Sequence, residues 1–531
     1  MLKKLNYFSY LYAEKYAGKD HLAEQSLHNL VISSILNFRE FVPNEYKKYD
    51  LEKILISKAM YYNTSIDKSL RQYYYLSKAL QKVIKNKKIS DSVSKSFIDI
   101  RNKRLAKSTK QKTFEDEKIL FIKEDIFPDR YSEKNELLFF ASQPSHIKVI
   151  DCFFEFSVLE DYRLVLPFRL KDKINLENIS NEKIIYFEEF LPLNSEAELR
   201  NFQKIFKEIY YKNNLEIKNL FKFDNTDFFT SQEVGIKNIF KFLLPQSLLF
   251  AISAERLLEN RGLSGVVGVR PRRIMDRAIL KTASNLGLNS SLIVHSTLGS
   301  DQRELWSSGL YDNITNLFGW GEKHSSLLEA DCYFKKENYI KAGSPLFNAP
   351  PKSRAFRDLN PRIIYASSRN DNTVLSSLNR FNKQNSEVQI AVKIRPGQDI
   401  DQNSENSFFD IEPGTFAIEE ILENYDILVT PYSGSHIAAI SEGLPVIFAP
   451  FYYEFIQDLE TLYGINDKTM SYSFAKNDYQ LRSILEKVIK DSDYRKKLIS
   501  QQTSYFNELV SGYTKKESVK VIEERIISKS K

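Results

Sequence analysis

The sequence predicts an α/β protein with two tandem, doubly wound parallel-sheet domains behind a helical N-terminal region. From residue 135 onward, short apolar runs bounded by Gly or Pro alternate with amphipathic stretches, which is typical of buried parallel strands joined by crossover helices. A polar, proline-containing stretch at 346–360 divides this alternation into two sets. Residues 1–112 lack the alternation, and their apolar residues follow a helical spacing.

Length and composition indicate a folded chain of several domains. The chain has 531 residues, of which 42% are hydrophobic and 13% aromatic, enough for sizeable cores. It contains no apolar run near the roughly 18–20 residues that span a bilayer and no clear signal peptide, so we expect a cytoplasmic protein. Cys152 and Cys332 lack the neighbouring His and Cys pattern of a zinc site, so we expect neither a disulfide framework nor a structural metal.

Positive charge is concentrated in one segment. The formal net charge of the chain is +7, whereas residues 78–112 carry twelve Lys or Arg against Asp91 and Asp99, a net charge of +10. We interpret such a segment first as a solvated helical face or linker, and binding to anionic lipid headgroups or a polyanionic acceptor is the alternative. No recognisable RNA- or DNA-binding module accompanies it, so nucleic acid is not an expected partner.

Residues 1–112 are predicted to form a helical N-terminal extension that contains the basic segment. Apolar and aromatic positions at 27–41, 51–62 and 70–84 follow the spacing of amphipathic helices. We interpret this region as an added domain, or as an extension that faces a partner or a membrane.

Residues 113–345 are predicted to form the first α/β domain. Its expected helices lie at 147–159, 195–211 and 272–286. Its expected strands are the short apolar runs at 136–141, 162–166, 184–187, 265–269, 291–295, 317–321 and 339–342. The alternation of strands and helices predicts a parallel sheet.

A linker at 346–360 and a second α/β domain at 361–531 follow. Its expected strands lie at 362–366, 388–394, 408–411, 427–430 and 446–449. Its expected helices lie at 373–382 and 415–424, with closing helices at 475–490 and 493–509. Two such domains in tandem place a ligand cleft between their carboxyl-side loops.

The segment 426–450 is the most informative stretch, since it reads as strand, Ser/Gly turn, short helix, glycine and strand. Ser433, Gly434 and Ser435 open the helix. Free backbone N–H groups, the helix dipole and two hydroxyls together favour a phosphate at this position. An ordinary helix N-cap uses the same residue types and is the alternative.

Three cations follow strands of the same domain. Lys393 and Arg395 occupy alternate positions at the end of the 388–394 strand, and Arg369 follows the 362–366 strand. With the Ser/Gly turn, these loops predict one phosphate site that needs no metal ion. Solvated surface cations are the alternative.

Three of the six histidines, His146, His295 and His436, fall at the ends of predicted strands or just after them. In an open α/β sheet this edge faces the ligand crevice. An imidazole with an ordinary pKa of about 6.5 suits proton abstraction near neutral pH. A packed or capping histidine is the alternative for each.

Several blocks of sequence together resemble a known enzyme family. The blocks are ELLFFASQPSH at 136–146, DRAILKTASNLGLNSSLIVHSTLG at 276–299, LFGWGEKHSSLL at 317–328, YIKAGSPLFN at 339–348, VKIRPG at 392–397 and the segment 426–450. Their order and spacing resemble GT-B glycosyltransferases, above all bacterial capsule and surface-polysaccharide transferases and CDP-glycerol glycerophosphotransferase-like enzymes. The resemblance runs from about residue 135 to the C-terminus.

The sequence departs from the family pattern at three positions. Val294-His295-Ser296 stands where many relatives have Gln-His-Gly, and Arg395-Pro396 stands where many have His-Pro. Glu442 lies next to Gly443 rather than a turn earlier, so the usual ribose-binding acid has no clear match. The identity of the donor therefore does not carry over.

The resemblance implies two Rossmann-like domains, with acceptor bound by 113–345 and donor by 361–531. It implies an inverting, metal-independent glycosyltransferase, without cofactor, that moves a sugar from a nucleotide sugar to a capsule, O-antigen or lipid-linked acceptor. The candidate bases are His146, His295 and Asp276, in that order, and Arg270 and Arg272 are the candidate acceptor contacts. The candidate donor contacts are Arg369, Lys393, Arg395, Ser433, Gly434, Ser435 and His436.

Three alternatives stay open. A nucleotide-sugar 2-epimerase shares the two-domain architecture and a Ser-Gly phosphate loop, and a CDP-alditol phosphotransferase would use the same anion site. A non-catalytic scaffold that binds nucleotide or polysaccharide belongs to a different class. For an enzyme with a glycolipid acceptor, the basic segment 78–112 predicts a peripheral contact with the inner face of the cell membrane.

Overall fold

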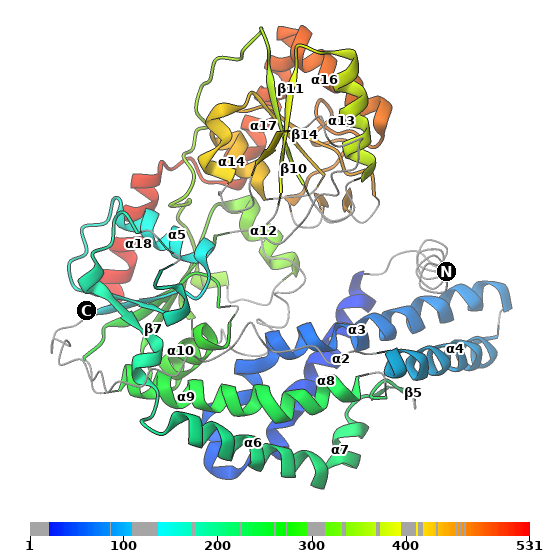
Figure 1. Cartoon of the computed structure of the whole chain (residues 1–531), viewed down its shortest axis with the longest axis vertical. Coiled ribbons are helices and arrows are strands. Elements are labelled where there is room, and N and C mark those ends of the chain that lie inside the picture. The colour runs from blue at the N-terminus through cyan, green and yellow to red at the C-terminus, as the bar shows by residue number, and fades with distance from the viewer. Residues whose placement is uncertain are drawn as a thin grey trace.

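The computed structural model describes residues 21–84, 86–108, 136–172, 174, 176–223, 226–230, 232–259, 262–271, 273–295, 314–331, 336–367, 372–394, 410–412, 418–431, 434–452, 455–456, 459–460 and 463–530. Over these ranges the chain forms two Rossmann-like α/β domains and a helical region, which confirms the predicted fold class of two tandem parallel-sheet domains with N-terminal helices (Figure 1). No helix within these ranges has both the length and the hydropathy that a membrane span requires.

The first domain holds a seven-stranded sheet in which all neighbouring strands are parallel, with the order β3-β2-β1-β6-β7-β8-β9. Its strands are β1 (Leu137–Phe140), β2 (Tyr162–Leu166), β3 (Ile184–Tyr186), β6 (Gly265–Gly268), β7 (Asn289–Ile293), β8 (Ile314–Gly319) and β9 (Tyr339–Lys341). All seven overlap predicted strands. β7 ends two residues earlier than predicted, so His295 follows the strand instead of ending it.

Alternation of side chains along the strands divides the first sheet between two cores. Phe140 points to a core shared with α9 (Leu244–Leu258) and α10 (Ile274–Asn285). Phe139 points to the opposite face and packs with α5 (Pro144–Phe154). Both rings are buried, so each face of the sheet is covered, as the near-continuous apolar strands predict.

The second domain holds a five-stranded parallel sheet with the order β12-β11-β10-β13-β14. Its strands are β10 (Arg362–Ala366), β11 (Gln389–Lys393), β12 (Asp410–Glu412), β13 (Ile427–Thr430) and β14 (Val446–Phe448). Its helices are α13 (Asn372–Gln384), α14 (Ser435–Ser441), α16 (Asp478–Lys490) and α17 (Ser492–Leu509). The strands agree with the prediction, and α14 follows the Ser/Gly turn as expected.

One predicted helix of the second domain, 415–424, takes another form. The described part consists of two short 3₁₀ turns, Ile418–Glu420 and Leu422–Asn424. Directly after them, Asp426 donates its N–H to the carbonyl of Arg362 at 2.7 Å and accepts the N–H of Arg362 on its carboxylate at 2.8 Å. Because Asp426 pairs with the start of β10, the backbone is extended from this residue into β13, and the helical turns end before it.

The helical region extends beyond residues 1–112. It combines the N-terminal helices with the helices between β3 and β6. The two helices predicted at 51–62 and 70–84 form one continuous helix, α3. The helices are α2 (His21–Leu36), α3 (Leu51–Ile84), α4 (Lys87–Ser108), α6 (Ser195–Lys212), α7 (Asn214–Asn219), α8 (Glu233–Asn238) and α9. Phe38 and Phe240 lie in one buried core, with ring centroids 5.0 Å apart. The N-terminal helices thus share a core with the first domain instead of forming a separate extension.

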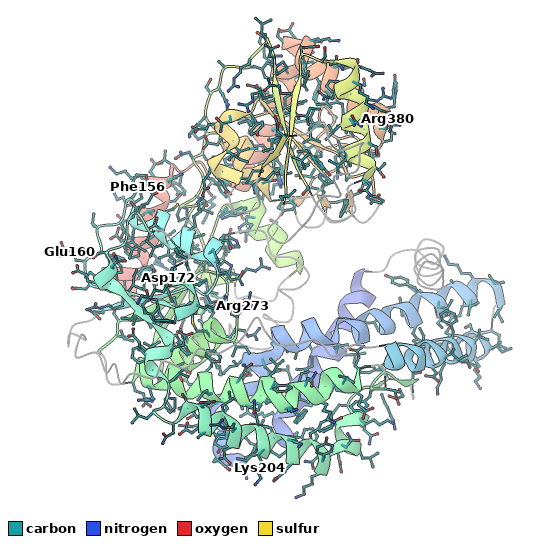
Figure 2. The ribbon with its side chains drawn as sticks, viewed as in Figure 1. Phe156, Glu160, Asp172, Lys204, Arg273 and Arg380 are labelled. Carbon is teal, nitrogen blue, oxygen red and sulfur yellow. The ribbon has the colours of Figure 1, made fainter. Side chains whose placement is uncertain are left out.

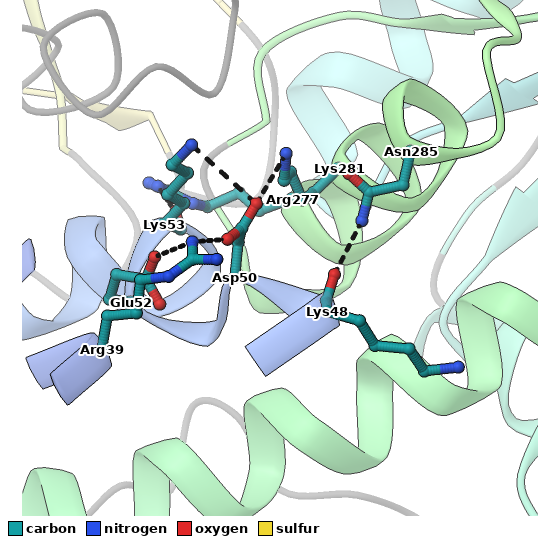
Figure 3. Close-up of polar contacts among 8 residues, drawn as sticks. All are labelled: Arg39, Lys48, Asp50, Glu52, Lys53, Arg277, Lys281 and Asn285. Carbon is teal, nitrogen blue, oxygen red and sulfur yellow. Dashed lines mark hydrogen bonds and ion pairs between the residues drawn. The ribbon is translucent and has the colours of Figure 1, made fainter. Parts of the chain in front are cut away.

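A cluster of charged side chains fixes the start of α3 against α10 (Figure 3). Asp50 adopts the left-handed conformation just before α3, with φ of 48°. Its carboxylate lies 2.9 Å from Nζ of Lys281 on α10 and also accepts a hydrogen bond from Arg39. Lys53 lies 3.9 Å from the same carboxylate, so the anion of Asp50 is shared by three cations at the junction.

Two further contacts of α10 reach the same segment (Figure 3). Arg277, which is fully buried, donates to the backbone carbonyl of Lys53. The amide of Asn285 donates to the carbonyl of Lys48 at 3.1 Å. Contacts therefore run along α10 from its first turn to its last.

The last helix, α18 (Lys515–Ser530), returns to the first domain and lies beside α5 (Figure 1). Val519 and Ile522 are fully buried in the same core as Phe139. Glu523 accepts the N–H of Val158 at 3.2 Å. The structure thus differs from the predicted boundary, because α16 and α17 close the second domain and α18 belongs to the first.

We expect Asp50→Asn to lower the free energy of unfolding by about 3 kcal/mol, because the substitution removes the anion shared by Lys281 and Arg39. Asn tolerates the left-handed backbone at this position. Urea unfolding followed by circular dichroism measures the change. The matched control is Asp493→Asn, whose exposed carboxylate pairs with Lys496 at 3.3 Å, and it should cost less than about 1 kcal/mol. Equal effects of the two substitutions would contradict a stabilising cluster.

Candidate functional site

The candidate site lies at the carboxyl edge of the first sheet. From the adjacent strands β1 and β6, the chain continues outward in opposite directions, to β2 and β3 on one side and to β7, β8 and β9 on the other. The crevice at such a switch point is where open α/β sheets bind ligands. Figure 2 illustrates the two edges, since Glu160 before β2 and Arg273 after β6 lie on opposite sides of the domain.

Two of the predicted histidines meet at this switch point. His146 lies in the first turn of α5, directly after β1, and only 2% of its surface is exposed. His295 follows β7 and is half-buried. The centroids of the two rings are 4.8 Å apart, with the rings inclined by 66°. The structure therefore brings together two imidazoles that stand far apart in the sequence.

The third candidate base, Asp276, connects two of the same loops. It lies in the first turn of α10 and is 1% exposed. Its carboxylate accepts the hydroxyl of Ser142, which follows β1. It also accepts the N–H of Arg273 at 3.5 Å, as the N3 residue of a capping box does. Asp276 thus joins the loop after β1 to the helix after β6.

Two further loops at this edge support Ser142. Arg169, just after β2, donates to the carbonyl of Ser142 at 2.9 Å. Its neighbour Phe168 donates its N–H to the carboxylate of Glu188, after β3, at 2.7 Å. Burial raises the pKa of Glu188, and the hydrogen bond from Phe168 opposes this shift. Hydrogen bonds therefore tie together the loops after β1, β2, β3 and β6.

An aromatic group supports the loop of His295 from the other side. The indole of Trp320 donates to the carbonyl of Val294 at 2.8 Å, and its ring stacks on His324 at a centroid distance of 4.6 Å. The hydroxyl of Tyr339 donates to the carbonyl of Gly321 at 2.8 Å, and burial raises the pKa of this phenol. His324 thus packs on Trp320, whereas His146 and His295 pack on each other.

The arrangement is suited to proton transfer. A neutral imidazole accepts a proton from a hydroxyl, and a neutral aromatic ring in contact with it can stabilise the positive charge that forms. Asp276 already accepts hydrogen bonds from Ser142 and Arg273, and both engage its carboxylate within the protein. The ranking of His146 and His295 ahead of Asp276 as candidate bases stays a prediction.

Four of the predicted contact residues lie outside the described residues: Arg272, Arg369, Arg395 and Ser433. Of the others, Arg270 is half-buried between β6 and α10, on the site's edge of the sheet. Lys393 ends β11 and is 7% exposed, with its ammonium donating to the carbonyl of Ile394 at 3.2 Å. Gly434 is exposed and Ser435 half-buried at the start of α14. These donor and acceptor contacts stay predictions.

His436 has a different role from the predicted donor contact. Its ring is fully buried, 4.6 Å from the ring of Tyr463 and 5.4 Å from that of Phe448. Because α14 turns this side chain into the core behind the loop, the ring packs among aromatic side chains of the second domain. We assign His436 to packing.

A contact between the domains lies close to the paired histidines. Lys148, two residues after His146 on α5, lies 3.5 Å from the carboxylate of Glu420 and 3.9 Å from that of Glu419. The 3₁₀ turn that carries both acids contacts α14. One short segment of the second domain therefore contacts both α5 and α14.

Three residues that build this site were not predicted from the sequence: Ser142, Arg169 and Trp320. Ser142 has a recognisable signal, since it directly follows a strand at the same edge as His146. Arg169 and Trp320 act through a backbone carbonyl of another loop. Nothing in the sequence around either residue indicates which carbonyl it would reach.

No family model and no curated protein matches the chain. Comparison with solved structures does give structural neighbours. A UDP-GlcNAc 2-epimerase from Neisseria meningitidis bound to UDP-GlcNAc is 10% identical, with a TM-score of 0.46, over 74% of this chain and 100% of its own. A UDP-GlcNAc 2-epimerase from Methanocaldococcus jannaschii is 12% identical, with a TM-score of 0.45, over 73% and 99%. The glycotransferase of kitacinnamycin is 11% identical, with a TM-score of 0.44, over 73% and 98%. Such likenesses carry no argument about activity.

We expect Ser142→Ala to lower the free energy of unfolding by about 1–3 kcal/mol, because it removes a donor from the buried carboxylate of Asp276. Thermal unfolding measures the change. Ser326→Ala is the matched control, since this exposed hydroxyl donates to the carbonyl of Glu322 within its own helix. If the two variants unfold at the same temperature, the bond between Ser142 and Asp276 contributes nothing to stability.

We expect Glu188→Gln to stabilise the protein at neutral and higher pH. Burial raises the pKa of Glu188 in the folded state, so its contribution to stability is greatest at low pH and is lost as pH rises through the folded pKa. Gln keeps an oxygen for the N–H of Phe168 and does not ionise. The difference in unfolding temperature should shrink toward about pH 4. A variant that is less stable than the wild type at every pH would refute this expectation.

Proposed function

We propose that the protein is a glycosyltransferase that moves a sugar from a nucleotide sugar to a surface-glycan acceptor, with inversion and without a metal ion. The observation that carries the proposal is the contact between the rings of His146 and His295 at the switch point of the first sheet. Paired imidazoles at this edge supply a base for an acceptor hydroxyl. The resemblance of the sequence to GT-B transferases supports the same assignment.

Each domain has its own role in the proposed reaction. In the first, His146 takes the proton from the acceptor hydroxyl, and His295 and Asp276 hold the charges around it. In the second, Lys393, Gly434 and Ser435 contact the donor phosphates, together with Arg369, Arg395 and Ser433. Arg270 and Arg272 contact an anionic acceptor. The ion pairs of Lys148 with Glu419 and Glu420 support a single active site between the domains.

The proposal assigns departure of the nucleotide to fixed groups instead of a metal. As the acceptor oxygen bonds to the anomeric carbon, the bond from that carbon to the phosphate oxygen breaks, and backbone N–H groups and cations aimed at the phosphate stabilise the negative charge of the departing nucleotide. The acceptor classes that we propose are capsule, O-antigen and lipid-linked glycans.

The first experiment is a thermal-shift measurement with UDP, GDP, CDP and CMP, each in EDTA and in magnesium. A nucleotide at a hundred times its dissociation constant should stabilise the protein by about 2.7 kcal/mol. We expect one nucleotide to act selectively and equally in both buffers. UDP or GDP indicates a neutral sugar, CMP an acidic sugar, and CDP the alditol-phosphate alternative. A shift that requires magnesium refutes metal independence, and no shift with any nucleotide favours the scaffold.

In the same series, His146→Gln should lower the rate of sugar transfer by about 10²–10⁴-fold while the nucleotide shift persists, because only the base is lost. His28→Gln, on α2 in the helical region, is the control and should transfer at the wild-type rate. Product analysis separates the enzyme classes, since a 2-epimerase changes the nucleotide sugar without any acceptor. If the His146→Gln variant transfers sugar at the wild-type rate, His146 is not the catalytic base.

A further inference from the structure

Helices α3 and α4 form an arm that projects from the helical region (Figure 1). The face of α4 that is buried carries Ser90, Ser94 and Ile98. On the α3 side, the hydroxyl of Ser77 donates to the carboxylate of Asp91. Among the described side chains, this contact thus combines small and polar residues with Ile98, and four other large apolar residues of α4 lie outside it.

Those larger residues lie on the outside of the arm. Ile89, Val93, Phe97 and Ile100 are 51%, 48%, 41% and 54% exposed. Their spacing of four, four and three residues places them in one stripe along α4, roughly 16 Å long at 1.5 Å per residue. We call this the α4 stripe. Among the described residues, most other exposed large apolar side chains, such as Leu193, stand singly. A continuous exposed stripe of this kind marks an interaction surface.

The α4 stripe has basic neighbours. Lys82, Lys87 and Lys88 at the tip of the arm are exposed, and Lys95 on α4 is half-buried. Asp91 already accepts a hydrogen bond from Ser77. The surrounding sequence, 78–112, has a net charge of +10. The surface around the stripe thus favours an anionic partner.

We propose that the α4 stripe and its flanking lysines dock the protein on an anionic lipid surface. A helix that is apolar on one side and rich in Lys lies in the plane of a membrane interface, with its apolar side chains below the headgroups. The stripe supplies the buried apolar area and the lysines supply attraction to the lipid charge. A second copy of this chain fits less well, because two basic arms would repel each other.

This inference goes beyond the proposed transfer reaction and does not depend on it. The acceptor side of the proposed function requires only a glycan, whereas the arm specifies where the protein binds in the cell. The arm is also separate from the paired histidines, so its variants leave the candidate site intact.

The test is flotation of the full-length protein with vesicles of phosphatidylcholine alone and of equimolar phosphatidylcholine and phosphatidylglycerol. We expect binding to the anionic vesicles that weakens at high salt. The variant Val93→Ser with Phe97→Ser should bind at least about tenfold more weakly, since it removes apolar area from the interface. Ser matches Val and Phe in helix propensity, so α4 should persist. Replacing Lys87 and Lys88 by Gln should also weaken binding about tenfold.

Two controls match these variants within the helical region. Leu193→Ser changes a single apolar residue that is 68% exposed. Lys204→Gln changes an exposed cation on α6, which lies away from α4 (Figure 2). Both should bind vesicles like the wild type.

Several outcomes would overturn the proposal. Absence of wild-type binding to anionic vesicles, equal binding to neutral vesicles, or unchanged binding after both serine substitutions would each do so. Circular dichroism and the unfolding temperature identify a variant that has lost its fold, and in that case the Lys87 and Lys88 variant decides. Size-exclusion chromatography with light scattering tests the rival occupant. A dimer that is lost in the serine variant would assign the stripe to a second copy instead of a membrane.

Discussion

The arrangement of the first domain depends on hydrogen bonds at the buried start of α10. Two consecutive residues there form hydrogen bonds to different parts of the protein. Asp276 accepts the hydroxyl of Ser142 and joins the loops at the switch point of the sheet. The next residue, Arg277, donates to the carbonyl of Lys53 at the start of α3. Because both side chains are buried, neither bond can be replaced by water at low cost. One short segment therefore couples the candidate site to the helical region.

This coupling explains why the N-terminal helices are not an accessory. The ion pairs of Asp50 with Lys281 and Arg39 fix the start of α3, and α3 continues unbroken into the arm that carries the α4 stripe. A long helix transmits its orientation as a rigid element. The position of the arm relative to the paired histidines thus follows from the packing of α3 on α2, α9 and α10, so a protein docked through α4 would present its site at a defined orientation to the lipid surface.

Much of the site could be predicted from the sequence, because polar residues that follow parallel strands collect at one edge of a sheet. This rule places His146, His295 and Asp276 at that edge, where the structure also has them, and their roles stay predictions. It treated His436 in the same way, yet that ring packs against Tyr463 and Phe448. The rule gives the edge on which a residue lies and not the direction of its side chain, which depends on the rotation of the following helix. Trp320 and Arg169 were missed because each reaches a backbone carbonyl far away in the sequence.

The sequence by itself determined the two parallel sheets, the position of nearly every strand and the helical character of the N-terminal region. These features arise from local apolar periodicity, which a single chain displays directly. Only the tertiary structure decided that α2 and α3 share a core with α9, that α18 returns to the first domain, and that the imidazoles of His146 and His295 are in contact. Each of these depends on side chains from distant segments filling one interior, and close packing of that kind is not encoded in any single stretch of sequence.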